Sequence, residues 1–220
     1  MKIVVVAAMR SELRAFQRRR APGDGAATGV LGIGTALARA STEQLLDEHD
    51  PDHLLVIGVA GGIGAGTSVG DLVVPEIVLD GATGEEHRPA PIPGLVNSGV
   101  LHTSDRLVGP SEADELVARG VVALDMETAA VASVCGRRGV AWSVMRGISD
   151  HVDDPVDPGV LGMVGPEGQA RPLAVLSYVA RNPGRLRRMA QLAKGLDAAT
   201  GASADAAAAA IARLSRPAGG

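Results

Sequence analysis

Three acidic side chains stand at the ends of apolar runs or at the starts of helix-like segments. Glu12 follows the first apolar run of the chain, Glu127 opens a helix-like segment, and Asp150 ends a later apolar run. Carboxyl groups are common acids and bases in bond cleavage. Each of these three, taken alone, is nevertheless more often a helix cap or a surface charge.

Residues 121–150 bring several of these features together. Their sequence, VVALDMETAAVASVCGRRGVAWSVMRGISD, is typical of a short strand, a helix with an acidic start, a glycine stop and a second strand. Polar groups therefore gather at the start of a helix and at the end of a buried strand. In open α/β sheets that edge is where ligands bind.

Arg146 lies inside the apolar run of that second strand. A buried guanidinium is costly without a partner, so Arg146 requires a carboxylate or a bound anion nearby. A structural arginine–carboxylate pair and an anion-binding arginine are both compatible with this requirement. The sequence alone leaves that choice open.

A glycine-rich segment, GVAGGIGAGTSVG at 58–70, follows an apolar run at 53–57. Backbone N–H groups of such a loop can approach an anion or a sugar closely. The segment lacks the Gly-Lys-Ser/Thr of a Walker loop, and its glycines do not fit the dinucleotide fingerprint. A purely structural turn is an equally good interpretation.

Apolar runs alternate with helix-like segments along the whole chain. Strands are expected at 2–9, 53–57, 71–79, 99–103, 121–124 and 140–148, and helices at 11–20, 36–49, 110–119, 127–138 and 173–196, the last interrupted near residue 183. Turn-rich connections are expected at 22–29 and 80–97. This alternation predicts an α/β sandwich around a central mixed sheet.

Length and composition limit the class of protein. The 220 residues predict one domain at 1–200, followed by an alanine-rich tail at 201–220. The net charge of −4 gives no case for a nucleic-acid partner. The single cysteine, Cys135, is interpreted as core packing, and the five histidines show no zinc-binding spacing. Because no apolar run is long enough to span a bilayer, we expect a cytoplasmic protein.

Four ordered motifs resemble the nucleoside phosphorylase/nucleosidase superfamily. They include KIVVVAAMRSEL, GVAGGIGAGTSVGDLVV and ALDMETAAVASVCGRRGVAWSVMRGISD, and lie at about 2–13, 32–38, 56–75 and 102–150. The branch that they resemble most is the methylthioadenosine/S-adenosylhomocysteine nucleosidases. The resemblance implies a three-layer α/β/α sandwich around a central mixed sheet. It implies cleavage of the N-ribosidic bond of an adenosine-type, 5′-substituted purine nucleoside. It also implies a homodimer or higher homo-oligomer that needs no cofactor or metal, with phosphate as a possible co-substrate.

Carried over by motif, the resemblance implies a role for each matching residue. Glu127 in DMET would bind the ribose 2′- and 3′-hydroxyls, with Met126 packing against the sugar. Asp150 in GISD would protonate the purine N7 as the base departs, and Ser149 would help to hold that loop.

The same resemblance assigns the nucleophile side and the base side of the site. Glu12 in MRSEL would activate water, and Arg146 would lie near the incoming water or phosphate. Leu107 and Val108 would pack on the base, and Gly61 would contact the substrate. Departure of the base leaves an oxocarbenium-like sugar, so carboxylates on both sides suit this chemistry, as they do in glycoside hydrolysis.

A departure from the family pattern and a rival class of protein keep alternatives open. Phosphorylases of the superfamily usually place Thr or Ser after the glycine that corresponds to Gly58, whereas Val59 stands here. The loss of that hydroxyl weakens the case for phosphate without deciding between hydrolysis and phosphorolysis. A nucleoside-binding protein without catalysis is the alternative from another class, although the retained Glu12, Glu127, Arg146 and Asp150 argue against it.

The C-terminal segment 171–196 resembles a second group, the hopanoid-biosynthesis-associated phosphorylases. That resemblance implies release of adenine from a lipid-linked adenosine as a further alternative. Arginines alternate with apolar residues in this segment, so residues 173–196 could touch an anionic membrane surface peripherally. A solvated helix that covers the edge of the domain explains the same pattern.

Overall fold

The computed structural model describes residues 1–106, 108–152 and 186–215. Within this part of the chain, a mixed sheet of nine strands forms the centre of the molecule. The strands are β1 (Ile3–Ala7), β2 (Ala27–Val30), β3 (His53–Gly62), β4 (Leu72–Val73), β5 (Ile77–Asp80), β6 (Glu86–His87), β7 (Val100–Thr103), β8 (Val121–Asp125) and β9 (Ala141–His151). The helices are α1 (Arg10–Gln17), α2 (Thr35–His49), α3 (Pro110–Ala118), α4 (Thr128–Arg138) and α7 (Leu186–Leu214).

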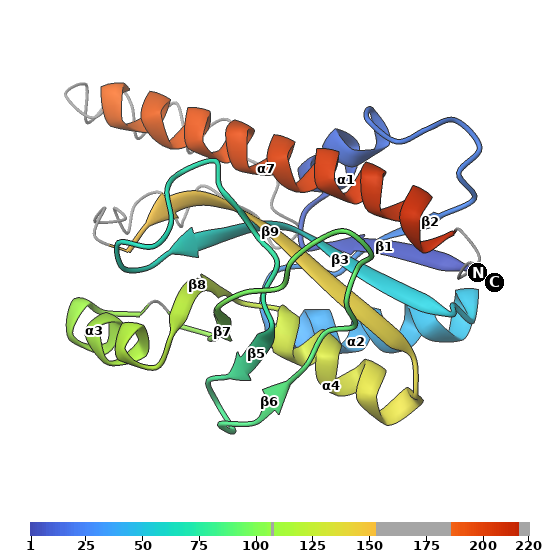
Figure 1. Cartoon of the computed structure of the whole chain (residues 1–220), viewed down its shortest axis with the longest axis horizontal. Coiled ribbons are helices and arrows are strands. Elements are labelled where there is room, and N and C mark those ends of the chain that lie inside the picture. The colour runs from blue at the N-terminus through green and yellow to red at the C-terminus, as the bar shows by residue number, and fades with distance from the viewer. Residues whose placement is uncertain (107, 153–185, 216–220) are drawn as a thin grey trace.

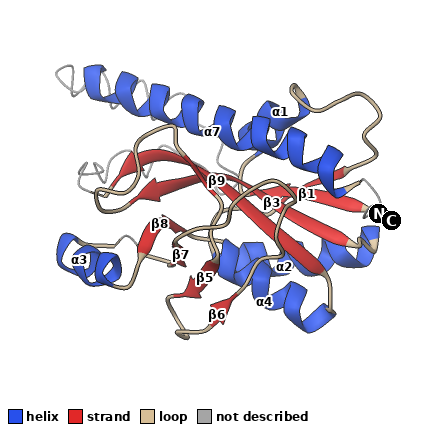
Figure 2. Ribbon diagram, in the orientation of Figure 1, coloured by secondary structure: helices blue, strands red, loops and turns tan. Residues whose placement is uncertain are grey.

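Helices cover both faces of this sheet. Helices α1 and α7 lie on one face, and α2 and α4 lie on the other (Figures 1 and 2). Alternate residues of β1 serve the two cores: Val4 and Val6 pack with the α2–α4 layer, whereas Val5 and Ala7 pack with the α1–α7 layer. This is the side-chain alternation of a strand buried on both faces. The predicted α/β/α sandwich around a mixed sheet is confirmed.

Strand β3 organises the sheet because it pairs with three other strands. Its first half runs parallel to β1, its whole length runs parallel to β9, and its last two residues, Gly61 and Gly62, also pair antiparallel with β8. Beyond β8 the order continues through β7, β5 and β6. The ends of β1, β8 and β9 thus meet around the second half of β3, where the acidic residues of the sequence lie.

Helix α7 packs unusually close to β9. A methyl group added at Gly147 would collide with the backbone carbonyl of Ala199, and one added at Gly195 would collide with the carbonyl of Ser149. The glycines therefore let helix backbone and strand backbone touch. Ala199 and Ala207 are completely buried at this contact.

The structure departs from the expected elements at four places. Residues 58–62 continue β3 instead of opening a loop, and residues 27–30 form β2, which pairs in parallel with β1. The expected strand 71–79 is divided into β4 and β5 around Pro75, since proline cannot donate to a sheet ladder. Helix α7 continues to Leu214 instead of ending near residue 196, because its alanines combine high helix propensity with burial.

Part of the expected C-terminal helix falls on residues that the structure does not describe. Residues 173–185 and 216–220 lie outside the described residues. The proposed membrane contact through 173–196 and the boundary at residue 200 stay predictions. Among the helices of the described ranges, none is both long and apolar enough to cross a membrane.

Candidate active site

Arg146 on β9 is the centre of a buried polar cluster. Its guanidinium Nη2 lies 2.5 Å from Asp125 Oδ2 and 3.5 Å from Glu127 Oε2, and it donates to Thr128 Oγ1 at 2.9 Å. Nη1 donates to the carbonyl of Ile57 at 3.3 Å. The side chain is 1% exposed. The requirement for a carboxylate partner, inferred from the sequence, is thus met by two acids.

Asp125, at the end of β8, is a site residue to which the sequence analysis gave no role. It accepts hydrogen bonds from the hydroxyls of Thr103 and Thr128, the first at 2.6 Å. It also accepts the backbone N–H of Thr128 at 3.2 Å, at the start of α4. These bonds fix the carboxylate that faces Arg146. The sequence carried one clue to it, the need of a buried arginine for a carboxylate or a bound anion nearby.

Glu12 reaches the same cluster from the start of α1. Its Oε2 accepts the N–H of Met9 at 2.8 Å, and its Oε1 accepts the N–H of Val59 at 2.9 Å. Because a glutamate at the third helical position can bond back to the residue that caps the helix, α1 orients this carboxylate. The second bond ties it to β3. Glu12 is 2% exposed.

Glu127 caps the other side of the cluster at the N-terminus of α4. Its Oε1 accepts the N–H of Gly34, which precedes α2, at 2.9 Å. Burial, followed by the negative charge of Asp125, raises the pKa of Glu127 from 4.5 to about 7. The side chain therefore changes charge near neutral pH.

Burial also affects the pKa values of Glu12 and Arg146. It raises the pKa of Glu12, while the positive charge of Arg146 and the N–H bonds from Val59 and Met9 oppose that rise. Burial alone would lower the pKa of Arg146, but the negative charges of Asp125, Glu127 and Glu12 raise it. Three carboxyl groups thus surround one cation, so the centre has an excess of potential negative charge.

Asp150 and Ser149 lie farther along β9, next to a β-bulge. Ile148 pairs with Ala60 and Asp150 pairs with Gly61, so Ser149 is the extra residue of β9. Bulges of this kind re-aim side chains and are common beside active sites. The Ser149 hydroxyl donates to Asp150 Oδ1. Gly61, expected to contact the substrate, therefore lies directly opposite Asp150.

The remaining predicted residues flank this edge. Met126 is half-buried between Asp125 and Glu127. Val108 is half-buried and packs against the small core of α3. Leu107 lies outside the described residues. Cys135 is buried in the core with its pKa raised by burial to about 12, as expected of a packing residue.

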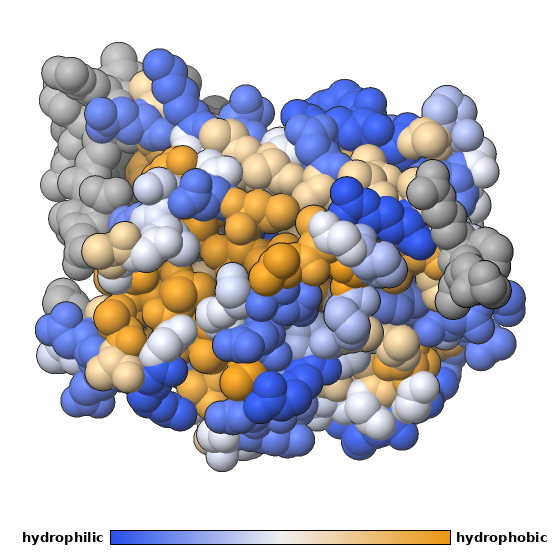
Figure 3. All heavy atoms as spheres, in the orientation of Figure 1, coloured by the Kyte–Doolittle hydropathy of each residue, from blue (hydrophilic) through white to orange (hydrophobic). Residues whose placement is uncertain are grey.

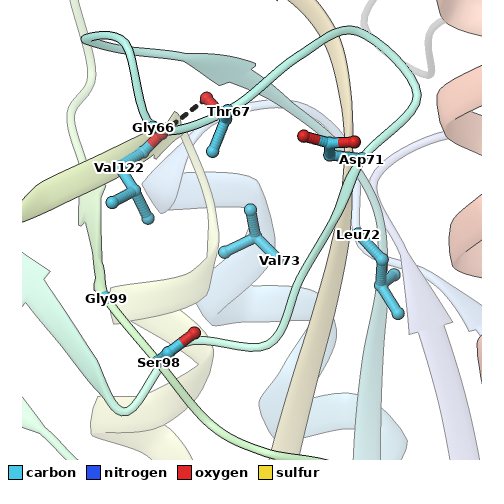
Figure 4. Close-up of a pocket in the computed structure, with 8 residues that line it drawn as sticks. All are labelled: Gly66, Thr67, Asp71, Leu72, Val73, Ser98, Gly99 and Val122. Atoms are coloured by element: carbon cyan, nitrogen blue, oxygen red, sulfur yellow. Dashed lines mark hydrogen bonds between the residues drawn. The ribbon is translucent and has the colours of Figure 1, made fainter.

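A cavity of about 410 Å³ lies beside β4. Its wall includes Leu72 and Val73 of β4, with Asp71, Ser98 and Val122 around it (Figure 4). Thr67 donates to the Val122 carbonyl at 3.5 Å, a bond drawn in Figure 4. The residues of the buried acidic cluster do not line this cavity, so it does not locate the chemistry.

The buried acidic cluster is suited to stabilising a positive charge that develops during a reaction. Fixed negative groups in a buried site stabilise a positive charge that forms in a transition state. Asp125, Glu127 and Glu12 place three carboxyl groups around a single guanidinium. Over the described ranges, no group of three or more His, Cys, Asp or Glu side chains could hold a metal ion.

Sequence comparison places this site in a known family. The model of the phosphorylase superfamily matches residues 21–94 and 93–180, more than half of the chain. The chain belongs to the phosphorylase superfamily. The segments that carry Gly34, Val59, Asp125, Glu127 and Arg146 all fall within the matched ranges.

Curated members of this superfamily give relatives at about 30% identity. The 5′-methylthioadenosine/S-adenosylhomocysteine nucleosidase of Exiguobacterium sp. is 30% identical over 154 residues, which are 56% of this chain and 66% of that protein. The Bacillus subtilis nucleosidase of the same name is 30% identical over 150 residues, or 54% and 65% of the two chains. The chain thus spans just under two thirds of the length of these relatives.

Solved structures of the superfamily share the fold along nearly the whole chain. The Neisseria meningitidis nucleosidase of that name, in complex with methylthio-immucillin-A, has a TM-score of 0.71 at 19% identity, covering 97% of this chain and 99% of that chain. The Arabidopsis thaliana 5′-methylthioadenosine nucleosidase has a TM-score of 0.72 at 17% identity, covering 98% and 96%. At these identities the likeness establishes the fold alone.

Proposed function

We propose that the protein cleaves the N-ribosidic bond of an adenosine-type, 5′-substituted purine nucleoside by hydrolysis. The observation that carries the proposal is the convergence of Glu12 and Glu127 on Arg146, which lies on the same strand as Asp150. The relatives named as 5′-methylthioadenosine/S-adenosylhomocysteine nucleosidases support the substrate class.

In this reaction the sugar becomes positively charged as the base departs. Glu127 accepts hydrogen bonds from the ribose 2′- and 3′-hydroxyls, and the half-buried Met126 packs against the sugar. An ionised Glu127 accepts both bonds better than a neutral one, since a carboxylate has only acceptor groups. The surrounding carboxylates stabilise the oxocarbenium-like sugar.

Asp150 supplies the proton to the purine N7, so that the base leaves as a neutral molecule. The Ser149 hydroxyl holds one carboxyl oxygen of Asp150 and leaves the other available for the base. Gly61, opposite Asp150, carries no side chain that would obstruct a ring at this position. Val108 packs on the base; the same role is expected of Leu107, which lies outside the described residues.

Water is a better nucleophile than phosphate for this site. Arg146 already lies against Asp125, Glu127 and Thr128, so its charge is largely neutralised within the protein. A phosphate dianion would enter an environment with excess negative charge, which is unfavourable at low dielectric. Val59 adds no hydroxyl for phosphate. Glu12, when ionised, can instead accept a proton from water.

Base release with and without phosphate tests the proposal. Purified protein is incubated with adenosine, methylthioadenosine and S-adenosylhomocysteine, and free adenine, ribose products and ribose 1-phosphate products are measured. We expect adenine and a free ribose product at a rate that does not depend on phosphate. A ribose 1-phosphate product that requires phosphate would contradict hydrolysis, and no base release from any of the three would contradict the proposed function.

We also propose that the protein is a homodimer or higher homo-oligomer. Val69, Leu72 and Leu196 are between 36% and 47% exposed, although they are large apolar residues. Figure 3 shows apolar side chains gathered across the middle of one face, below α7. Light scattering after size-exclusion chromatography tests this, and a monomer at micromolar concentration would contradict it.

A further inference from the structure

We propose that Ser203 on α7 is a positioning residue for the nucleophile side of the active site. The inference rests on the proposed function, because it concerns the orientation of Glu12. Ser203 lies 1% exposed beneath the sheet edge that carries the acidic cluster. It does not contact the acidic side chains directly and acts through the backbone of β3.

The hydroxyl of Ser203 joins two neighbouring strands. It accepts the backbone N–H of Gly58 on β3 at 2.9 Å and donates to the carbonyl of Met145 on β9 at 3.1 Å. Gly58 is the register partner of Arg146 in this pair of strands. One side chain of α7 thus fixes β3 against β9 at the level of the central arginine.

Gly58 adopts a backbone conformation that side chains rarely allow. Its φ is +137°, and a methyl group there would lie 2.5 Å from Glu12 Oε1 and 2.7 Å from Arg146 Nη1. Glycine is therefore required both by the backbone angle and by the close approach of the two charged groups. The Ser203 hydroxyl holds the amide of this glycine in place.

The amide that follows Gly58, that of Val59, connects Ser203 to the orientation of Glu12. The N–H of Val59 donates to Glu12 Oε1 at 2.9 Å. Two consecutive amides of β3 are therefore held by side chains, Gly58 by Ser203 and Val59 by Glu12. The two amides are joined through the backbone of Gly58. A rotation about the backbone bonds of Gly58 would therefore turn the N–H of Val59 away from the Glu12 carboxylate.

The neighbours of Ser203 on α7 indicate that its hydroxyl is not needed for packing. Ala199 and Ala207, one turn before and one turn after it, are completely buried against the same layer. Small apolar side chains thus suffice for the close contact of α7 with the sheet. The hydroxyl stands where a strand amide and a strand carbonyl both need a partner, which is costly to leave unmet.

Ser203→Ala is the direct test, measured on the full-length chain with methylthioadenosine. We expect kcat to fall roughly ten- to hundredfold with little change in KM, since a misoriented base slows the chemical step more than binding. The acidic limb of the pH profile of kcat/KM should move to higher pH. The reason is that the lost Val59 bond normally opposes the rise in the pKa of Glu12.

Two further variants separate positioning from general destabilisation. Ala207→Gly weakens the same helix without touching Gly58, so it should lower Tm and leave the pH profile unchanged. Ser203→Cys keeps the size of the side chain with a weaker hydrogen-bonding group, so it should fold and give an intermediate shift.

Titration of the Glu12 carboxyl by ¹³C NMR, assigned with Glu12→Gln, provides a readout that needs no activity. We expect the pKa of Glu12 to be higher in Ser203→Ala than in the wild type. An unchanged pKa and an unchanged pH profile would overturn the proposal, even if Tm fell. Wild-type protein that releases no base would contradict the proposed function alone, because the titration still decides the role of Ser203.

Discussion

Asp125 Oδ2 lies 2.5 Å from Arg146 Nη2, and both side chains are only 1% exposed. The pair joins the end of β8 to the middle of β9. Further hydrogen bonds offset the cost of burying an ion pair, and the hydroxyls of Thr103 and Thr128 supply them to Asp125. The Asp125–Arg146 pair therefore holds in place the guanidinium around which Glu127 and Glu12 are arranged.

Removal of the charge of Asp125 should destabilise the protein strongly. Asp125→Asn leaves a buried guanidinium with weaker partners, and we expect the free energy of unfolding to fall by about 3–5 kcal/mol. Urea denaturation followed by circular dichroism measures this. The matched control is Glu112→Gln, which breaks the exposed Arg106–Glu112 pair. That variant should cost less than about 1 kcal/mol, and equal losses in the two variants would contradict the prediction.

The pairing of Arg146 with an acid could be predicted from the sequence, because the kind of contact follows from the charge of a buried arginine. An arginine in an apolar run requires an acid, and the structure supplies Asp125 and Glu127. Which acid pairs most closely could not be predicted, because DMET places two acids within three residues. The choice depends on the register of β8 and on the cap of α4.

Other features were missed because they depend on contacts far apart in the chain. Gly58 was expected to open a loop, since glycine is typical of turns, but here it lets Glu12 and Arg146 approach a strand. Ser203 was overlooked in an alanine-rich segment, because its partners lie on β3 and β9. Strand β2 has a short, weakly apolar sequence, and its pairing with β1 defines it.

The stability of the protein should fall as pH rises toward neutrality, in part because of Glu127. Its pKa of about 7 in the folded protein exceeds the ordinary value of 4.5, so the folded state binds the proton more tightly than the unfolded state. The contribution of Glu127 to the free energy of unfolding is about 3 kcal/mol. This contribution is fully present below about pH 4.5 and is lost as pH rises through about 7. Denaturation at a series of pH values should show a flatter profile for Glu127→Gln. Identical profiles would exclude Glu127 as the cause.

Replacement of Asp150 should abolish most of the activity while the fold persists. Asp150→Asn cannot donate an acidic proton to the purine, so kcat should fall by about 10²–10⁴-fold. Adenine release from methylthioadenosine measures the loss, and Tm checks the fold. Asp114→Asn, on the exposed side of α3, is the matched control and should retain wild-type rates. Full activity of Asp150→Asn would remove Asp150 from the mechanism.

The close contact of α7 with β9 can be tested with two glycine-to-alanine variants. Gly147→Ala would force a methyl group into the backbone carbonyl of Ala199, so we expect a loss of about 3 kcal/mol or more. Gly136 lies exposed in α4 with open space around it, so Gly136→Ala should stabilise the protein by about 0.5–1 kcal/mol. Thermal unfolding measures both changes. Because Ser203 reaches Gly58 from the same helix, Gly147→Ala should also lower kcat at temperatures well below its Tm. A Gly147→Ala protein with wild-type stability would show that α7 does not rest on β9 as described.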